Sequence, residues 1–186
     1  MALMLLGLVL FIGMHLMPVT GGKAALIERL GDKPYKAVFV LVSLAGIVVL
    51  VMGYNRADYV PVYTPPLWGR HLTMLLMLIG VVLVVAAYSP SRIKQMLGHP
   101  MLTGVALWGL GHLFVRGDLA SLLLFGGIGG YAVLARILSI GRVSPVTAKL
   151  PSQGLRADLI TVAIGIALYA ALLVAHPWLF GVAVIA

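Results

Sequence analysis

Residues 37–54 read AVFVLVSLAGIVVLVMGY, a run of 18 residues without a single charge. A helix needs about 20 mostly apolar residues to cross a bilayer, so this run predicts a membrane-spanning helix. Stretches of similar character lie on both sides of it. The predicted spans are residues 2–19, 37–54, 68–88, 101–115, 119–138 and 159–185. We therefore expect an all-α fold, a bundle of six transmembrane helices that forms one integral membrane domain over residues 1–186.

The composition of the whole chain agrees with this interpretation. Of 186 residues, 62% are hydrophobic and 10% are charged, whereas a soluble domain has roughly 45–50% apolar and about 25% charged residues. The net charge of +8 does not indicate nucleic-acid binding, because the basic residues lie between the apolar segments, where they set membrane topology. The absence of cysteine excludes disulfides, iron–sulfur clusters and covalently attached c-type haem.

The basic residues are distributed unevenly between the loops. The first, third and fifth loops hold ten of the thirteen: Lys23, Arg29, Lys33, Lys36, Arg92, Lys94, Arg136, Arg142, Lys149 and Arg156. Cytoplasmic loops are enriched in Lys and Arg. The distribution therefore predicts a multi-pass protein of the bacterial inner membrane with both termini on the periplasmic side. In the last span, Pro177 predicts regular helix only to about Ala175, after which the chain kinks or settles near the interface.

The five acidic residues all fall in loops or at the ends of spans: Glu28, Asp32, Asp58, Asp118 and Asp158. Ion-coupled transporters usually bury a carboxylate near the middle of the membrane. Such a transporter is therefore disfavoured. The ionisable side chains left within the predicted spans are mainly imidazoles, which can bind transition metals, including haem iron.

Position along the spans sorts the histidines by depth. His71 and His112 lie close to the outer boundary, so depth alone favours them as a facing pair of ligands. His176 lies at the same end, but beside Pro177 and Trp178 it is most simply explained as an interfacial anchor. His15 lies on the inner half of the first span, and His99 lies in a turn at the inner surface.

Helical spacing favours a different pair. Residues four apart share one helix face, and two spans repeat the same order of small residue, aromatic ring and imidazole. The two stripes are Gly7, Phe11 and His15, and Gly104, Trp108 and His112. A flat macrocycle needs close approach, stacking and an axial ligand, although coincidence is about equally probable in a chain with 22 glycines. In the fifth span, Gly126, Gly127, Gly129 and Gly130 predict tight helix packing.

Several segments resemble the NnrU family of membrane proteins. They are FIGMHLMP at 11–18, RLGDKPYK at 29–36, PPLWGRHL at 65–72, YSPSRIKQMLGHPMLTGVALWGLGHLF at 88–114 and RGDLASLLLFG at 116–126. The similarity runs from the first span through the fifth and covers about three quarters of the chain. The last span resembles the family only in its hydrophobicity.

The resemblance implies a function in bacterial denitrification, in the handling of nitrite and nitric oxide. The family is related to plant zeta-carotene isomerase, a membrane haem b enzyme with histidine ligands. The resemblance favours His15 and His112 as the axial ligands, and the remaining motif histidines are His71 and His99. Because depth favours His71 with His112, the second ligand is left open, with His112 common to both pairs. Arg70 and Arg116 would pair with the haem propionates, and Trp108 would line the site. The isomerase has a cysteine near one ligand that this chain lacks, which puts zeta-carotene-type cis-trans isomerisation in doubt.

Two alternatives from other classes remain. The basic stretch before His99 and Pro100 is similar to the cofactor site of small membrane methyltransferases at the cytoplasmic face, although Gly98 replaces the usual arginine. The chain could also be a non-catalytic assembly factor for a nitric oxide or nitrite reductase. The expected partners are the lipid bilayer, a hydrophobic or gaseous small molecule, and possible reductase components. Whether the protein is an enzyme is left open; if it is, a haem-dependent isomerase or redox enzyme is expected.

Overall fold

A computed structural model gives the structure of the protein and describes residues 1–141 and 154–184. Every regular element within these ranges is a helix, which confirms the all-α prediction. The helices are α1 (Ala2–Thr20), α2 (Gly22–Leu30), α3 (Asp32–Tyr54), α4 (Gly69–Ala86), α5 (Arg92–Leu97), α6 (Pro100–Leu113), α7 (Leu119–Leu138) and α9 (Leu155–Phe180). Arg142 and Lys149, which contributed to the predicted topology, lie outside the described residues.

Five of these helices are long and apolar enough to cross a membrane: α1, α3, α4, α7 and α9. They correspond to five of the six predicted spans, so the chain is a multi-pass membrane protein. The predicted fourth span, 101–115, forms the 14-residue helix α6 and is shorter than the others. It begins at Pro100 after the positive-φ residue Gly98, and it ends at Leu113, where the amide of Phe114 bonds back to Gly111.

The last span differs from the prediction at its end. Helix α9 does not stop being regular near Ala175 but continues through Pro177 to Phe180. Pro177 has no amide to donate, so one i→i−4 hydrogen bond is missing in the last turn, but the helix continues past it. Gly181 then ends the helix in the left-handed conformation, with φ of 71°, so residues 181–184 leave the predicted span and fold back.

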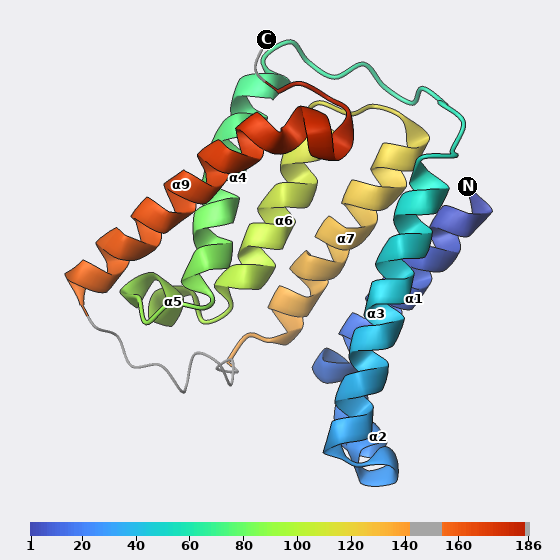
Figure 1. Cartoon of the computed structure of the whole chain (residues 1–186), viewed down its shortest axis with the longest axis vertical. Helices are drawn as coiled ribbons and strands as arrows, with labels where there is room; N and C mark the ends of the chain where they lie inside the picture. The colour runs from blue at the N-terminus through green and yellow to red at the C-terminus, as the bar shows by residue number, and fades with distance from the viewer. Residues whose placement is uncertain (142–153, 185–186) are drawn as a thin grey trace.

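The helices form two groups (Figure 1). Helix α1 packs along α3, while α6 lies between α4 and α7, and α9 crosses α4. Helix α1 also contacts α7, which joins the groups around a small core of Met4, Leu8, Leu50 and Ala120. The loops after α3 and α6 lie at one end of the molecule, together with the N-terminus and the end of α9, whereas α2 and α5 lie at the other end.

Glycines let several of these helices approach each other closely. A Cβ atom on Gly46 of α3 would lie 2.9 Å from the backbone nitrogen of Phe11 in α1, and one on Gly104 of α6 would lie 2.7 Å from the carbonyl oxygen of Gly80 in α4. Of the four glycines predicted to pack tightly in α7, Gly129 meets the backbone of α6 at Gly109, and Gly127 meets the side chain of Leu8. The other two, Gly126 and Gly130, face open space.

The loop between α3 and α4 is fastened to the turn between α6 and α7. The amide of Val62 donates to the Gly117 carbonyl at 2.9 Å, and the amide of Leu119 donates to the Val60 carbonyl at 2.8 Å. The Tyr63 hydroxyl donates to the carbonyl of Arg116 at 2.8 Å. These bonds fix the backbone of the turn that carries Arg116.

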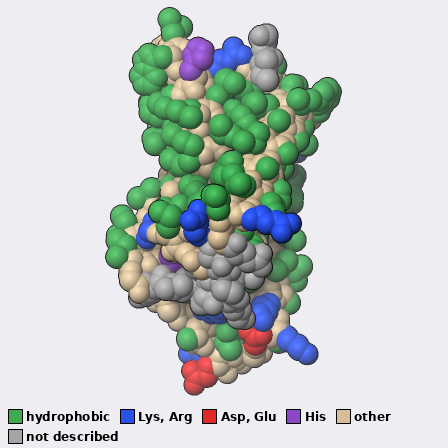
Figure 2. All heavy atoms as spheres, turned by 90° about the vertical axis from the view of Figure 1, so that its left-hand side faces the viewer, with side chains coloured by type: hydrophobic (Ala, Val, Ile, Leu, Met, Phe, Trp, Pro, Cys, Tyr) green, Lys and Arg blue, Asp and Glu red, His purple; other side chains and the backbone are tan. Residues whose placement is uncertain are grey.

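The surface is apolar over much of its length. Figure 2 shows a broad band of hydrophobic side chains on one face, with Lys and Arg side chains at its borders. Large apolar side chains of α9, among them Leu159, Ile164 and Leu168, are exposed. Such a surface fits the hydrocarbon region of a lipid bilayer.

The contact of α1 with α3 can be tested at Gly53. A methyl group at this position would meet the backbone of Met4, which cannot move aside as a side chain could. We expect Gly53→Ala to destabilise the protein by about 1–3 kcal/mol and to lower its thermal unfolding temperature in detergent. Gly130→Ala is the control, because nothing lies within 4 Å of the added group. Equal unfolding temperatures for the two variants would contradict this packing.

Candidate functional site

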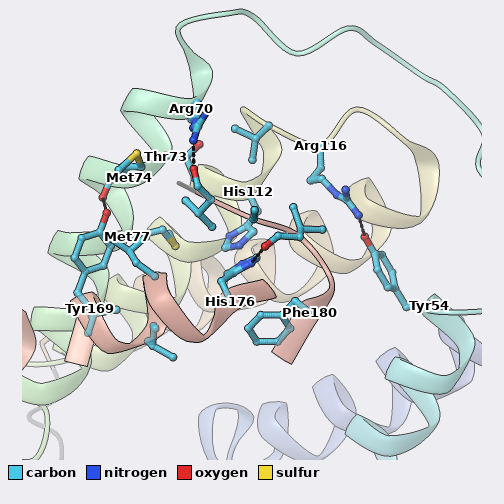
Figure 3. Close-up of a pocket in the computed structure, with 17 residues that line it drawn as sticks. Tyr54, Arg70, Thr73, Met74, Met77, His112, Arg116, Tyr169, His176 and Phe180 are labelled. Atoms are coloured by element: carbon cyan, nitrogen blue, oxygen red, sulfur yellow. Dashed lines mark hydrogen bonds between the residues drawn. The ribbon is translucent and has the colours of Figure 1, made fainter. Parts of the chain in front are cut away.

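A cavity of about 370 Å³ lies near the end of the molecule that carries the α3–α4 loop, between α4, α6, α9 and the segment after α9. Its volume falls within the range of about 300–1,000 Å³ that is usual for small-molecule sites. Apolar side chains form most of the wall, including Met74, Met77, Leu172 and Phe180. The polar side chains in the wall are those of Tyr54, Arg70, Thr73, His112, Arg116, Tyr169 and His176 (Figure 3).

His112 enters the cavity from α6 with its ring held on two sides. The Nδ1 atom lies 2.8 Å from the carbonyl oxygen of Trp108, one turn earlier in the same helix. A carbonyl can only accept, so Nδ1 carries the proton and the neutral ring keeps its lone pair on Nε2. The ring stacks on Phe125 of α7 with centroids 4.4 Å apart and planes inclined by 15°, and it contacts Trp108 at 5.2 Å.

His176 is held in the same manner on α9. Its Nδ1 atom lies 2.7 Å from the carbonyl oxygen of Val182, which the left-handed turn at Gly181 brings back toward the helix. This imidazole therefore also keeps a lone pair on Nε2 when neutral. The two rings line one cavity and lie near each other in Figure 3. Such backbone bonds at Nδ1 are the usual way in which proteins orient metal-binding histidines.

Two arginines make the cavity basic. Arg70 of α4 donates from its guanidinium to the carbonyl of Val184, and Arg116 donates to the Tyr54 hydroxyl at 2.9 Å. This bond to Tyr54 raises the pKa of Arg116 further above its ordinary value. None of the described residues that line the cavity is acidic. The electrostatics of the site therefore favour an anionic group on a largely apolar ligand.

Asp118, the acidic residue nearest to Arg116 in the sequence, does not line the cavity. Asp118 caps the start of α7, is only 7% exposed and accepts from the amide and hydroxyl of Ser121 at 2.9 and 2.6 Å. Burial is the largest single influence and would raise the pKa of Asp118, but the two bonds from Ser121 and the charge of Arg116 together leave the pKa below its ordinary value. Asp118 is therefore an anion at neutral pH.

The structure places the other predicted site residues away from this cavity. His15 is surrounded by the rings of Phe11, Phe39 and Tyr131, at centroid distances of 4.1, 5.1 and 6.1 Å, where α1, α3 and α7 meet. His71 is exposed at the start of α4. His99 is the N-cap of α6, at the opposite end of that helix from His112. Trp108 supports His112 without lining the cavity.

The two stripes found in the sequence are real, but their glycines have a different role. Phe11 contacts His15 and Trp108 contacts His112, as the spacing predicted. Gly7, however, lies against the backbone of α3, and Gly104 lies against that of α4. These glycines therefore provide helix packing and not the clearance for a macrocycle that the pattern suggested.

In the basic stretch considered for a methyltransferase site, Arg92 is paired, and among the described residues the buried ammonium group of Lys94 has no hydrogen-bond partner. Arg92 pairs with Asp158 of α9, with Nε and Oδ2 2.5 Å apart. Lys94 of α5 is 1% exposed, and burial lowers the pKa of its ammonium group. Neither residue lines the cavity described above.

Sequence reasoning missed His176 and Tyr54 as residues of the site. The depth of His176, at the same end as His112, was a usable signal. The turn at Gly181 that orients its ring was not visible in the pattern. Within the described ranges, no group of three or more His, Asp or Glu side chains is placed to hold a metal ion by itself.

Fold and site together define a multi-pass helical membrane protein with a basic cavity that contains two imidazoles. The chain belongs to the NnrU family, because the family described as NnrU protein matches residues 3–184. The match includes α9, beyond the segments that carried the resemblance in the sequence. Neither the curated proteins nor the solved structures gave a match.

The charge of Asp118 can be tested by a pH series. Because its pKa is lower in the folded protein, the stability it contributes is complete above the unfolded-state pKa of 3.8 and is lost as the pH falls through the folded value. Asp118→Asn keeps a capping residue but removes the charge. We expect it to lower stability by about 1 kcal/mol at neutral pH. Thermal unfolding should show this difference shrinking in acid, and a difference that does not change with pH would contradict the assignment.

Proposed function

We propose that this NnrU-family protein is a haem b protein of the bacterial inner membrane, in which the imidazoles of His112 and His176 would hold the haem iron. The observation that carries the proposal is the pair of imidazoles in one apolar cavity, each with Nδ1 committed to a backbone carbonyl. Both Nε2 lone pairs are thereby available for iron. The second ligand of the proposal is His176, where the sequence alone had suggested His15 or His71.

The residues of the cavity fit such a cofactor. Two imidazoles are a complete set of axial ligands for haem iron, because the porphyrin itself supplies the remaining nitrogens. The apolar side chains around Met77 and Leu172 suit a hydrophobic macrocycle, and Arg70 and Arg116 suit the two propionates. When bound, haem would supply one-electron redox chemistry and a binding position for nitric oxide.

The resemblance to NnrU proteins connects this site with denitrification. On this proposal the protein handles nitrite or nitric oxide, or transfers electrons in that process. Its own residues would set the behaviour of the iron through the identity of the ligands, the stacking of Phe125 on His112 and the positive charge of the two arginines.

Haem binding is tested by an absorption titration of the detergent-solubilised protein. We expect a Soret band that His112→Ala and His176→Ala each abolish or weaken at least about tenfold in affinity, because each removes an axial ligand. His15→Ala and His71→Ala are the controls, since neither lines the cavity, and both should bind as the wild type does. No Soret band in the wild type after haem addition would end the proposal.

We further propose that α6 is the sixth crossing and that both termini lie on the periplasmic side. Helix α6 runs beside α4 and α7, and the basic helices α2 and α5 lie at the end opposite the cavity. A helix of 14 residues spans about 21 Å, which suits a short crossing that is enclosed by its neighbours.

The absence of cysteine makes this topology easy to test. Single-cysteine variants Lys23→Cys and Tyr59→Cys place a thiol at exposed positions at opposite ends of α3. With a membrane-impermeant maleimide on intact spheroplasts, we expect labelling of Tyr59→Cys, whereas Lys23→Cys should react only after lysis. The reverse pattern would contradict the proposed orientation.

A further inference from the structure

Four side chains form a continuous hydrogen-bonded chain that reaches the wall of the cavity. The Arg116 guanidinium donates to the Tyr54 hydroxyl at 2.9 Å, and the hydroxyls of Tyr54 and Ser121 are 2.8 Å apart. The Ser121 hydroxyl donates to the carboxylate of Asp118 at 2.6 Å. Tyr54 comes from the end of α3, whereas the other three residues come from the α6–α7 turn and the start of α7.

The direction of this chain follows from the chemistry of its ends. Arginine has only donors and an ionised carboxylate has only acceptors. Tyr54 must therefore accept from Arg116 and donate to Ser121, and Ser121 must donate to Asp118. Each hydroxyl accepts a hydrogen bond from the side of Arg116 and donates one toward Asp118, and this common direction strengthens the bonds cooperatively.

This arrangement holds the carboxylate away from the guanidinium. Among the described residues, Arg116 and Asp118 form no ion pair within 4 Å, although they are two positions apart in the sequence. Within the same part of the chain, the Arg116 guanidinium donates to the Tyr54 hydroxyl. The group's remaining N–H donors are thus left for a ligand, because its natural counter-ion is occupied by Ser121.

The two arginines lie on either side of His112 in the cavity (Figure 3). Arg70 is held by the carbonyl of Val184, which leaves its charge uncompensated. Arg116 is held by Tyr54, whose hydroxyl is likewise neutral. A ligand with carboxylates at one edge would therefore meet two oriented cations and no competing acid in the described wall.

We infer that Tyr54 is a positioning residue that holds Arg116 toward the cavity, and that the site thereby selects a ligand bearing free carboxylates. The inference rests on the proposed function, in which the ligand is a porphyrin with two propionates. Tyr54 itself does not need to touch the ligand. Its role is to direct the guanidinium and to separate it from Asp118.

The test compares haem b with its dimethyl ester, which has the same ring but no carboxylates. Affinities are measured by Soret absorbance for the wild type, Tyr54→Phe and Arg116→Gln. A charge-assisted bond favours the free acid, so we expect the wild type to bind haem at least about tenfold more tightly than the ester. In Tyr54→Phe the affinity for haem should fall about tenfold while the affinity for the ester is unchanged.

A control and a double variant separate positioning from a general structural effect. Tyr131→Phe removes another interhelical hydroxyl, which bonds to the His15 carbonyl at 3.1 Å and does not line the cavity, and it should keep the selectivity of the wild type. Because Tyr54 acts through Arg116, combining Tyr54→Phe with Arg116→Gln should reduce selectivity no further than Arg116→Gln alone. An additional loss in the double variant would overturn the inference.

Ser121→Ala is measured in parallel, since it removes the acceptor of the Tyr54 proton and remains informative if Tyr54→Phe fails to fold. If Tyr54→Phe or Ser121→Ala folds, its selectivity for haem over the dimethyl ester should be lower than that of the wild type. Unchanged selectivity in either folded variant overturns the inference. If the wild type binds neither porphyrin, the proposed function fails and the inference fails with it. If the wild type binds both porphyrins equally, haem binding stands and only the inference is lost.

Discussion

Close contact at glycine sets how the helices of this protein pack around its cavity. Backbone meets backbone where α3 approaches α1 at Gly46 and where α6 approaches α4 and α7 at Gly104 and Gly109. Helix α9 has its close contact with α4 at Gly165, against Val82. Beyond that point α9 contributes Tyr169, Leu172 and His176 to the cavity wall. On the side of α9, the cavity thus opens beyond this close contact with α4.

The polar side chains of this cavity are oriented by hydrogen bonds to backbone carbonyls and a tyrosine hydroxyl, and not by acidic side chains. Carbonyls accept from His112, His176 and Arg70, and a tyrosine hydroxyl accepts from Arg116. These partners are neutral, so they orient the side chains without cancelling their charge. The imidazoles therefore keep an available lone pair, and the guanidiniums keep their attraction for an anion. Both properties are needed by a site for a ligand that is apolar at its centre and anionic at its edge.

The sequence predicts the parts of this structure that depend on local pattern. Hydropathy located five spans, and i, i+4 spacing placed Trp108 next to His112. Depth along the helix and a resemblance to NnrU proteins both singled out His112. The sequence pattern did not reveal His176 as the second proposed ligand beside His112. The orientation of its ring depends on the turn at Gly181, five residues further along the chain. The role of Tyr54 was equally hidden, since its bond to Arg116 joins residues 62 positions apart.

The most direct test of the proposed ligand pair is the low-temperature electron paramagnetic resonance spectrum of the oxidised, haem-reconstituted protein. Two imidazole ligands give low-spin ferric iron, and a single one gives a high-spin signal. A low-spin spectrum in the wild type that becomes high-spin in His176→Ala is the expected result. A high-spin wild type, or a low-spin signal that survives His176→Ala, would contradict ligation by His112 and His176.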